Sequence, residues 1–329
     1  MTPAPEQPVN PAPGSSMPGY PNLASGEAAL GRFAQAPRWP VYVFCLGAVI
    51  SAWVWLAFVA AGAGAVVTDD GTAVDLGPGM AVFRPFFEWL RGFTEGSAFL
   101  TFLVQLCAPA LPEAQSGSQA LGLFATMVAM WMMMSLAMMT PSAAPLVRTY
   151  CDIADTARGK GEPVISPTIL VVGYLLVWLA FSMIAATVQW GLISLGTIDD
   201  PVRPVQGWLA AAILLFAGYY QFSGLKDACL EKCRNPFSTL FANWQTTTSG
   251  VLRLGVQQGL YCLGCCWALM LVMLVLGTMN LAWMALFTLL AILEKSGSGK
   301  VTSRVSGGIL VAWGGILAVL SAVMTVSHA

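Results

Sequence analysis

The sequence predicts an all-α, polytopic membrane helix bundle with about seven transmembrane helices. Of the 329 residues, 57% are hydrophobic. Only 9% are charged, whereas a soluble domain carries roughly 25% charged residues. Several uncharged runs also approach or exceed the length of about 20 residues that a helix needs to cross a bilayer. A water-soluble globular protein is therefore excluded.

Six uncharged stretches account for the seven expected spans. Five of them are expected to supply one span each: Val41–Gly62, Gln119–Thr140, Pro167–Gln189, Gly207–Phe222 and a last span within 306–326. The sixth, Val256–Leu293, contains 38 residues, too many for one straight crossing. We expect it to form two short helices that turn near Gly277–Asn280, and a re-entrant hairpin would leave both of its ends on the same side.

The distribution of basic residues predicts the orientation, because cytoplasmic loops retain Lys and Arg. With the N-terminus inside and the C-terminus outside, twelve of the 15 basic residues lie on inner segments and three on outer segments. The opposite orientation inverts this ratio. We therefore expect a multi-pass protein of the cytoplasmic membrane with its N-terminus inside.

The expected domain organisation is simple. Residues 1–40 contain nine prolines, a composition typical of a disordered cytoplasmic tail. Residues 41–329 are expected to form the bundle. Within it, residues 68–118 form an outer segment of unassigned role, where charged residues repeat at helical spacing and predict an interfacial helix.

Five of the eight cysteines fall within 38 residues: Cys229, Cys233, Cys262, Cys265 and Cys266. On helices, the first two share one face and the last three share another. The expected topology places both groups near the cytoplasmic membrane surface, where thiols are more often metal ligands or reactive groups than disulfides. The alternative is apolar packing, which we expect for the isolated cysteines Cys45, Cys107 and Cys151. Nearby Lys226, Lys232 and Arg234 are expected to stabilise thiolates or to be ordinary inner-surface residues.

Methionines form a second cluster, with seven of the 16 between residues 127 and 139. Met130, Met134 and Met138 lie on one helical stripe, and Met270 continues the stripe of Cys262 and Cys266. Thioethers and thiolates are soft ligands that select Cu(I). The alternative is that methionine simply fills an irregular core.

Several function classes are excluded or disfavoured. A net charge of −1 gives no basic surface for nucleic acid. The single histidine, His328, excludes His-based zinc hydrolysis and Cys–His catalysis. No ionisable residue lies well inside an expected span, which disfavours proton- or sodium-coupled transport. Gly255 and Gly259 are spaced to permit close helix contact.

Three strings carry a family resemblance: MWMMMSLAMMTPSAAP (130–145), YYQFSGLKDACLEKCRNP (219–236) and the segment 259–295. The region 119–295 that they span resembles the bacterial family of predicted metal-binding integral membrane proteins known as domain of unknown function 2182. The resemblance implies a bacterial inner-membrane protein with cysteine metal ligands. The matching residues are Met138, Met139, Pro141, Gln221, Lys226, Cys229, Cys233, Arg234, Cys262, Cys265, Cys266, Trp267, Met279, Asn280, Glu294 and Lys295. The family often has a histidine where this chain has Gln258, which implies a softer or weaker site here.

The sequence therefore predicts a membrane protein that binds a soft metal ion, Cu(I), for import, delivery or copper-enzyme assembly. The expected ligands are the five clustered cysteines together with Met130, Met134, Met138 and Met270. Zinc is the alternative metal, since thiolates suit it too. The expected partners are lipid, the metal ion and a partner metalloprotein or membrane complex. A structural subunit and a membrane thiol oxidoreductase, through Cys262-Leu-Gly-Cys265, are the alternative functions.

Overall fold

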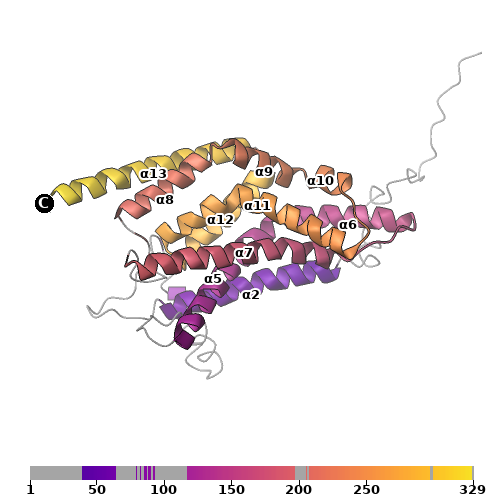
Figure 1. Cartoon of the computed structure of the whole chain (residues 1–329), viewed down its shortest axis with the longest axis horizontal. Helices are drawn as coiled ribbons and strands as arrows, with labels where there is room; N and C mark the ends of the chain where they lie inside the picture. The colour runs from indigo at the N-terminus through magenta and orange to yellow at the C-terminus, as the bar shows by residue number, and fades with distance from the viewer. Residues whose placement is uncertain are drawn as a thin grey trace, which may run out of the picture.

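The structure, a computed structural model, describes residues 39–63, 117–196, 205, 207–296 and 299–327, with isolated positions between 79 and 92. Those residues form ten α-helices and no strand, as the sequence predicts. Figure 1 shows the long helices lying side by side along one axis, with α8 and α13 on one flank and α2 on the other. The helices are α2 (Trp39–Ala63), α5 (Gly117–Ser142), α6 (Ala144–Gly159), α7 (Pro167–Ser194), α8 (Gly207–Tyr220), α9 (Gly224–Arg234), α10 (Pro236–Ala242), α11 (Thr248–Leu276), α12 (Leu281–Ser296) and α13 (Gly299–Ser327).

Five of these helices, α2, α5, α7, α11 and α13, are long and apolar enough to cross a membrane. Helices α8 and α9 qualify only as a pair, which is bent by 61° at the break between them. The chain is therefore of the membrane type, with five candidate spans, or six if the bent pair is one span, where the sequence predicts seven. The shortfall arises because α8 has 14 residues and α12 has 16, each short for a full crossing.

The predicted break in the 38-residue apolar run is confirmed. Helix α11 ends at Leu276, and Gly277 then adopts φ +93°, a conformation that favours glycine. Asn280 accepts a hydrogen bond from the backbone N–H of Trp283 through its side chain, which caps α12 from Leu281 onward. The chain therefore reverses over four residues.

Two helices begin earlier than the apolar pattern predicts. Helix α11 begins at Thr248, because the side chain of Thr247 accepts a hydrogen bond from the N–H of Gly250 and caps it. Helix α13 begins at Gly299 and includes the charged residues Lys300 and Arg304. Hydropathy finds only the apolar part of a helix and misses such polar first turns.

Four helices pack against one another in a ring within the core. Helix α7 packs against α5 and α11, and α12 packs against the same two helices from the other side. Helix α5 thus lies diagonally opposite α11. The buried bond from the indole N–H of Trp131 on α5 to Gln189 on α7, and the contact of Tyr174 with Met139, show that α5 runs antiparallel to α7.

Glycines allow α7 and α11 to pack at backbone distance. A Cβ atom built on Gly173 would overlap the carbonyl oxygen of Leu252, and one on Gly255 would overlap that of Leu170. At Gly259 an added Cβ would lie 2.8 Å from a side-chain methyl of Val177. The predicted close contact through Gly255 and Gly259 is confirmed.

The outer helices turn apolar residues away from the bundle. Only 17% of the most apolar window of α13 and 22% of that of α2 are buried, whereas α11 reaches 67%. This exposure agrees with contact with lipid. Residues 1–38 of the expected tail, most of the outer segment 68–118, Cys107 and His328 lie outside the described residues, and α2 already begins at Trp39.

Candidate metal site between helices α9 and α11

The short helix α9 presents one stripe of residues to the bundle. Lys226, Cys229, Leu230 and Cys233 are spaced at helical intervals, and Ser223 caps the helix by accepting a hydrogen bond from the N–H of Lys226. Lys226 and Leu230 are buried, and the two cysteines are half-buried. The predicted common face of Cys229 and Cys233 therefore looks toward the protein interior.

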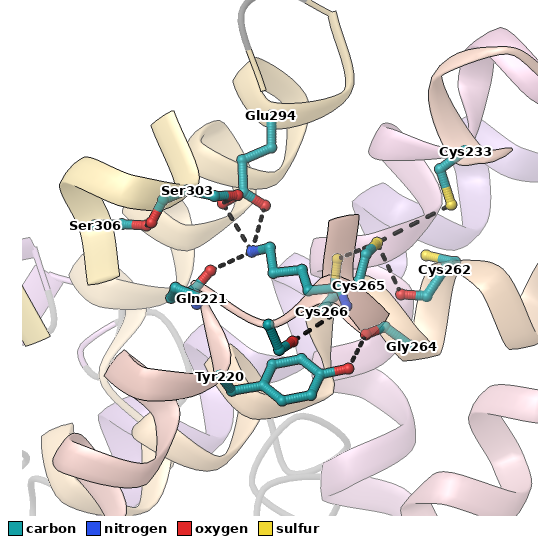
Figure 2. A network of polar contacts seen from close by, with 12 residues as sticks. Tyr220, Gln221, Cys233, Cys262, Gly264, Cys265, Cys266, Glu294, Ser303 and Ser306 are labelled. Carbon is teal, nitrogen blue, oxygen red and sulfur yellow. Dashed lines mark hydrogen bonds and ion pairs between the residues drawn. The ribbon is translucent and has the colours of Figure 1, made fainter. Parts of the chain in front are cut away.

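That face meets the cysteines of α11. The sulfur of Cys233 lies 4.0 Å from the sulfur of Cys265 (Figure 2). The sulfur of Cys229 lies directly over Gly264, where an added Cβ would be only 2.6 Å from it. The structure thus brings together thiols from two stretches that are more than 30 residues apart in sequence.

The three cysteines of α11 are buried and contact one another. The sulfur of Cys265 lies 3.2 Å from that of Cys266, and its thiol donates to the carbonyl oxygen of Cys262 at 3.1 Å. The α9 and α11 groups approach each other through the sulfurs of Cys233 and Cys265. Among the residues that the structure describes, the five clustered cysteines are all free thiols.

Cys262 lies where four helices converge. Its sulfur is 3.0 Å from the hydroxyl of Tyr174 on α7 and 3.2 Å from the ammonium of Lys295 on α12. Both groups also reach α5: Tyr174 donates to the carbonyl of Met139 at 3.2 Å, and Lys295 donates to the hydroxyl of Ser142 at 2.6 Å. The C-terminal end of α5 and the thiol of Cys262 therefore share two hydrogen-bonding residues.

The predicted methionine ligands lie in the same core as the buried cysteines. Met130, Met134, Met138 and Met270 are each at most 3% exposed. Because α5 is antiparallel to α7 and α7 runs alongside α11 in the same direction, both methionine stripes extend from the level of Cys262 toward the same end of the bundle. The structure places these four side chains inside the bundle instead of toward lipid.

A buried ion pair lies beside the cysteines. The ammonium of Lys226 bonds both carboxylate oxygens of Glu294 at 2.9 Å, and it also donates to Gln221 (Figure 2). Ser303 donates to the same carboxylate at 2.9 Å. Next to this network, the hydroxyl of Tyr220 donates to the carbonyl of Gly264, the residue beneath Cys229.

Sequence reasoning missed most of this polar framework. The sequence predicts Lys226 as a cation that stabilises thiolates or as an ordinary inner-surface residue, but its ammonium is buried and pairs with Glu294. The cation that contacts a thiol is Lys295, which hydropathy assigns to an inner loop. One signal was available: Glu294 and Lys295 end the long apolar run abruptly, and both belong to the strings that carry the family resemblance. Nothing in the sequence marked Tyr174.

The arrangement of the thiols suits a soft metal ion but does not form a complete set of ligands around one. Within the residues that the structure describes, no group of three or more His, Cys, Asp or Glu side chains is arranged to hold a metal ion. Two of the thiol contacts are sulfur–sulfur pairs, Cys233 with Cys265 and Cys265 with Cys266, and thiolates are soft ligands that select Cu(I). A monovalent ion that accepts few sulfur ligands suits this set better than a hard cation.

Comparison with known protein families gives a match over most of the described core. A family model described as copper chaperone, PpoB2, matches residues 128–317, which is more than half of the chain. This match includes both cysteine groups. It supports the metal-binding, membrane-type character implied by the resemblance to domain of unknown function 2182, but it does not support membership of that particular family. No curated protein matches the chain, and no solved structure matches it.

Proposed function

The chain belongs to the PpoB2 copper chaperone family, and from that premise we propose that it is an integral membrane protein that binds Cu(I) between α9 and α11. The proposed ligands are Cys229, Cys233, Cys262, Cys265 and Cys266, with Met130, Met134, Met138 and Met270 along the adjoining core. The proposed task is to receive copper and deliver it to a partner metalloprotein or membrane complex. Copper is the cargo in this account, and zinc is the competing ion.

One observation carries the proposal: the 4.0 Å separation between the sulfurs of Cys233 and Cys265. A metal–sulfur bond is about 2.3 Å, so two sulfurs that share an ion on opposite sides lie about 4.6 Å apart. The observed separation is close to that value.

The methionines support a route for the ion through the bundle. A neutral thioether binds a soft monovalent ion without adding charge to the membrane interior, where charged groups are costly. Both stripes are buried, and Met139, next to Met138, accepts a hydrogen bond from Tyr174, which also contacts Cys262. We propose that they carry copper away from, or toward, the thiols.

The proposed location of the thiols is the cytoplasmic side of the bacterial inner membrane. The twelve-to-three distribution of basic residues supports this orientation. In the reducing cytoplasm the cysteines stay available as ligands instead of forming disulfides.

The test is copper loading of the purified full-length protein under anaerobic conditions. We expect bound Cu(I) in the parent protein and its loss when the five clustered cysteines are all changed to Ser. The matched control changes Cys45 and Cys151 to Ser, because these thiols lie in a separate small cluster with Val41 and Val171. Equal copper retention in the five-cysteine variant and the control would refute the proposal.

A thiol oxidoreductase is the second candidate, and the same pair of sulfurs favours it. Cys233 and Cys265 approach closely across two helices, which a disulfide between them would require. Thiol trapping over a range of redox potentials separates the two functions. Reversible loss of two labelled thiols at a defined potential supports the enzyme, whereas labelling that changes only with copper supports the chaperone.

A further inference from the structure

Helix α9 has few side chains that are fully buried against the rest of the bundle. Of its eleven residues, only Lys226 and Leu230 are buried. These two residues are one helical turn apart and lie on the same stripe as Cys229 and Cys233. The position of the two thiols over α11 therefore depends on what holds Lys226 and Leu230.

Lys226 is fixed by polar contacts that involve three other elements. Its ammonium is fully buried and bonds both oxygens of Glu294, which is 1% exposed, near the end of α12. It also donates to Gln221 at the bend between α8 and α9. Glu294 in turn accepts from Ser303 of α13. One ion pair thus connects the bend, α9, α12 and α13.

Leu230 is fixed by apolar contacts, close to the Lys226–Glu294 ion pair. An added Cβ on Gly299 would lie 3.1 Å from a methyl carbon of Leu230 and would overlap the carbonyl oxygen of Glu294. Leucine packing tolerates sliding, because dispersion contacts have little directional preference. A charged pair with a bidentate carboxylate fixes orientation and register, which is the best-attested use of a buried ion pair.

We propose that Lys226 and Glu294 are positioning residues for copper exchange: their ion pair holds α9 so that Cys229 and Cys233 lie over Gly264 and Cys265. This inference rests on the proposed function only for the identity of the cargo. Copper exchange takes place on the α9 side, because its thiols are half-buried whereas those of α11 are buried. Loss of the ion pair moves the α9 thiols away from their α11 partners and leaves the buried thiols in place.

The first experiment measures thiol proximity without copper. In a chain that keeps only Cys233 and Cys265, with the other cysteines changed to Ser, dibromobimane becomes fluorescent when it alkylates both thiols. Lys226→Met and Glu294→Gln are each compared with this parent. The double variant Lys226→Met/Glu294→Gln leaves no unpaired charge and therefore guards against simple misfolding. The charge exchange Lys226→Glu/Glu294→Lys tests for rescue.

The matched control is Arg158→Ala. It breaks the ion pair between Arg158 and Asp155. This pair also joins a basic side chain to a carboxylate, at 3.0 Å, but it lies on the exposed side of α6. This variant should bridge Cys233 and Cys265 at the parent rate.

We expect both single variants and the double variant to slow bridging by about tenfold, and the charge exchange to recover most of the rate. If the ion pair served only overall stability, its loss would alter size-exclusion behaviour. A positioning role instead lowers the rate of bridging between Cys233 and Cys265 at unchanged size-exclusion behaviour. Parent-level bridging in the double variant, at unchanged size-exclusion behaviour, would overturn the inference.

The second experiment measures Cu(I) affinity in the chain with all its cysteines, by competition with bicinchoninate. Glu294→Gln should weaken binding by about tenfold relative to the parent, with Arg158→Ala unchanged. If the parent binds no Cu(I), the proposed function fails, while the bridging result still decides the positioning role. If the parent binds and Glu294→Gln binds equally well, only the positioning role fails.

Discussion

The ammonium group of Lys295 lies 3.2 Å from the sulfur of Cys262, and the same group donates to Ser142 at 2.6 Å. Lys295 is on α12, Cys262 is on α11, and Ser142 ends α5. A cation held against a buried thiol offsets the negative charge of a thiolate site inside the bundle, where an uncompensated charge is costly.

Replacing Lys295 with Met should therefore weaken Cu(I) binding. We expect a loss of about tenfold, equal to about 1.4 kcal/mol, because the site loses its compensating charge. Lys295→Arg keeps the charge and should retain more affinity than Lys295→Met. Competition titration with a Cu(I) chelator measures both variants, and equal affinities for them would argue against a role for this charge.

Gly264 is expected to be essential for the position of Cys229. Gly264→Ala places a Cβ 2.6 Å from the sulfur of Cys229, too close for any real contact, so that side chain must move. Copper stoichiometry or affinity should fall while the protein stays folded. Gly308→Ala is the control, because an added Cβ there has no neighbour within 4 Å. Identical copper binding by the two variants would contradict this expectation.

The close approach of α7 and α11 should not tolerate a side chain at Gly255. An added Cβ would overlap the backbone of Leu170, which cannot rotate away. We expect Gly255→Ala to destabilise the protein by about 1–3 kcal/mol, the usual cost of overpacking. Thermal unfolding in detergent measures it, with Gly191→Ala on the open side of α7 as the control. A variant as stable as this control would show that the helices can separate freely.

The methionine stripe of α5 should matter for copper movement more than for folding. Changing Met130, Met134 and Met138 together to Leu conserves volume, so stability should change by less than about 1.5 kcal/mol per site. Transfer of copper to an external chelator should slow, because the thioethers are lost. Met183→Leu, at an exposed position on α7, is the control. Unchanged transfer kinetics in the triple variant would reduce the stripe to packing.

The apolar pattern predicted much of the helical architecture. It located the reversal near Gly277, because an uncharged run of 38 residues cannot cross a bilayer once, and it identified both cysteine faces by their helical spacing. It did not predict that α8 stops at Tyr220 and that α9 leaves at a bend, since a bend depends on tertiary partners. For the same reason the pattern placed Lys226 in a loop. Its ammonium is in fact buried, where it bonds Glu294, a residue 68 positions further along the chain.

At the proposed copper site, the unequal burial of the thiols would affect how quickly a bound ion is released. Copper held between Cys233 and Cys265 has one half-buried ligand and one buried ligand. An incoming thiol from a partner can therefore attack from the α9 side while the buried sulfur keeps its bond. The rate of handover then follows the concentration of the acceptor instead of spontaneous dissociation, so a very tight complex can still empty within a useful time.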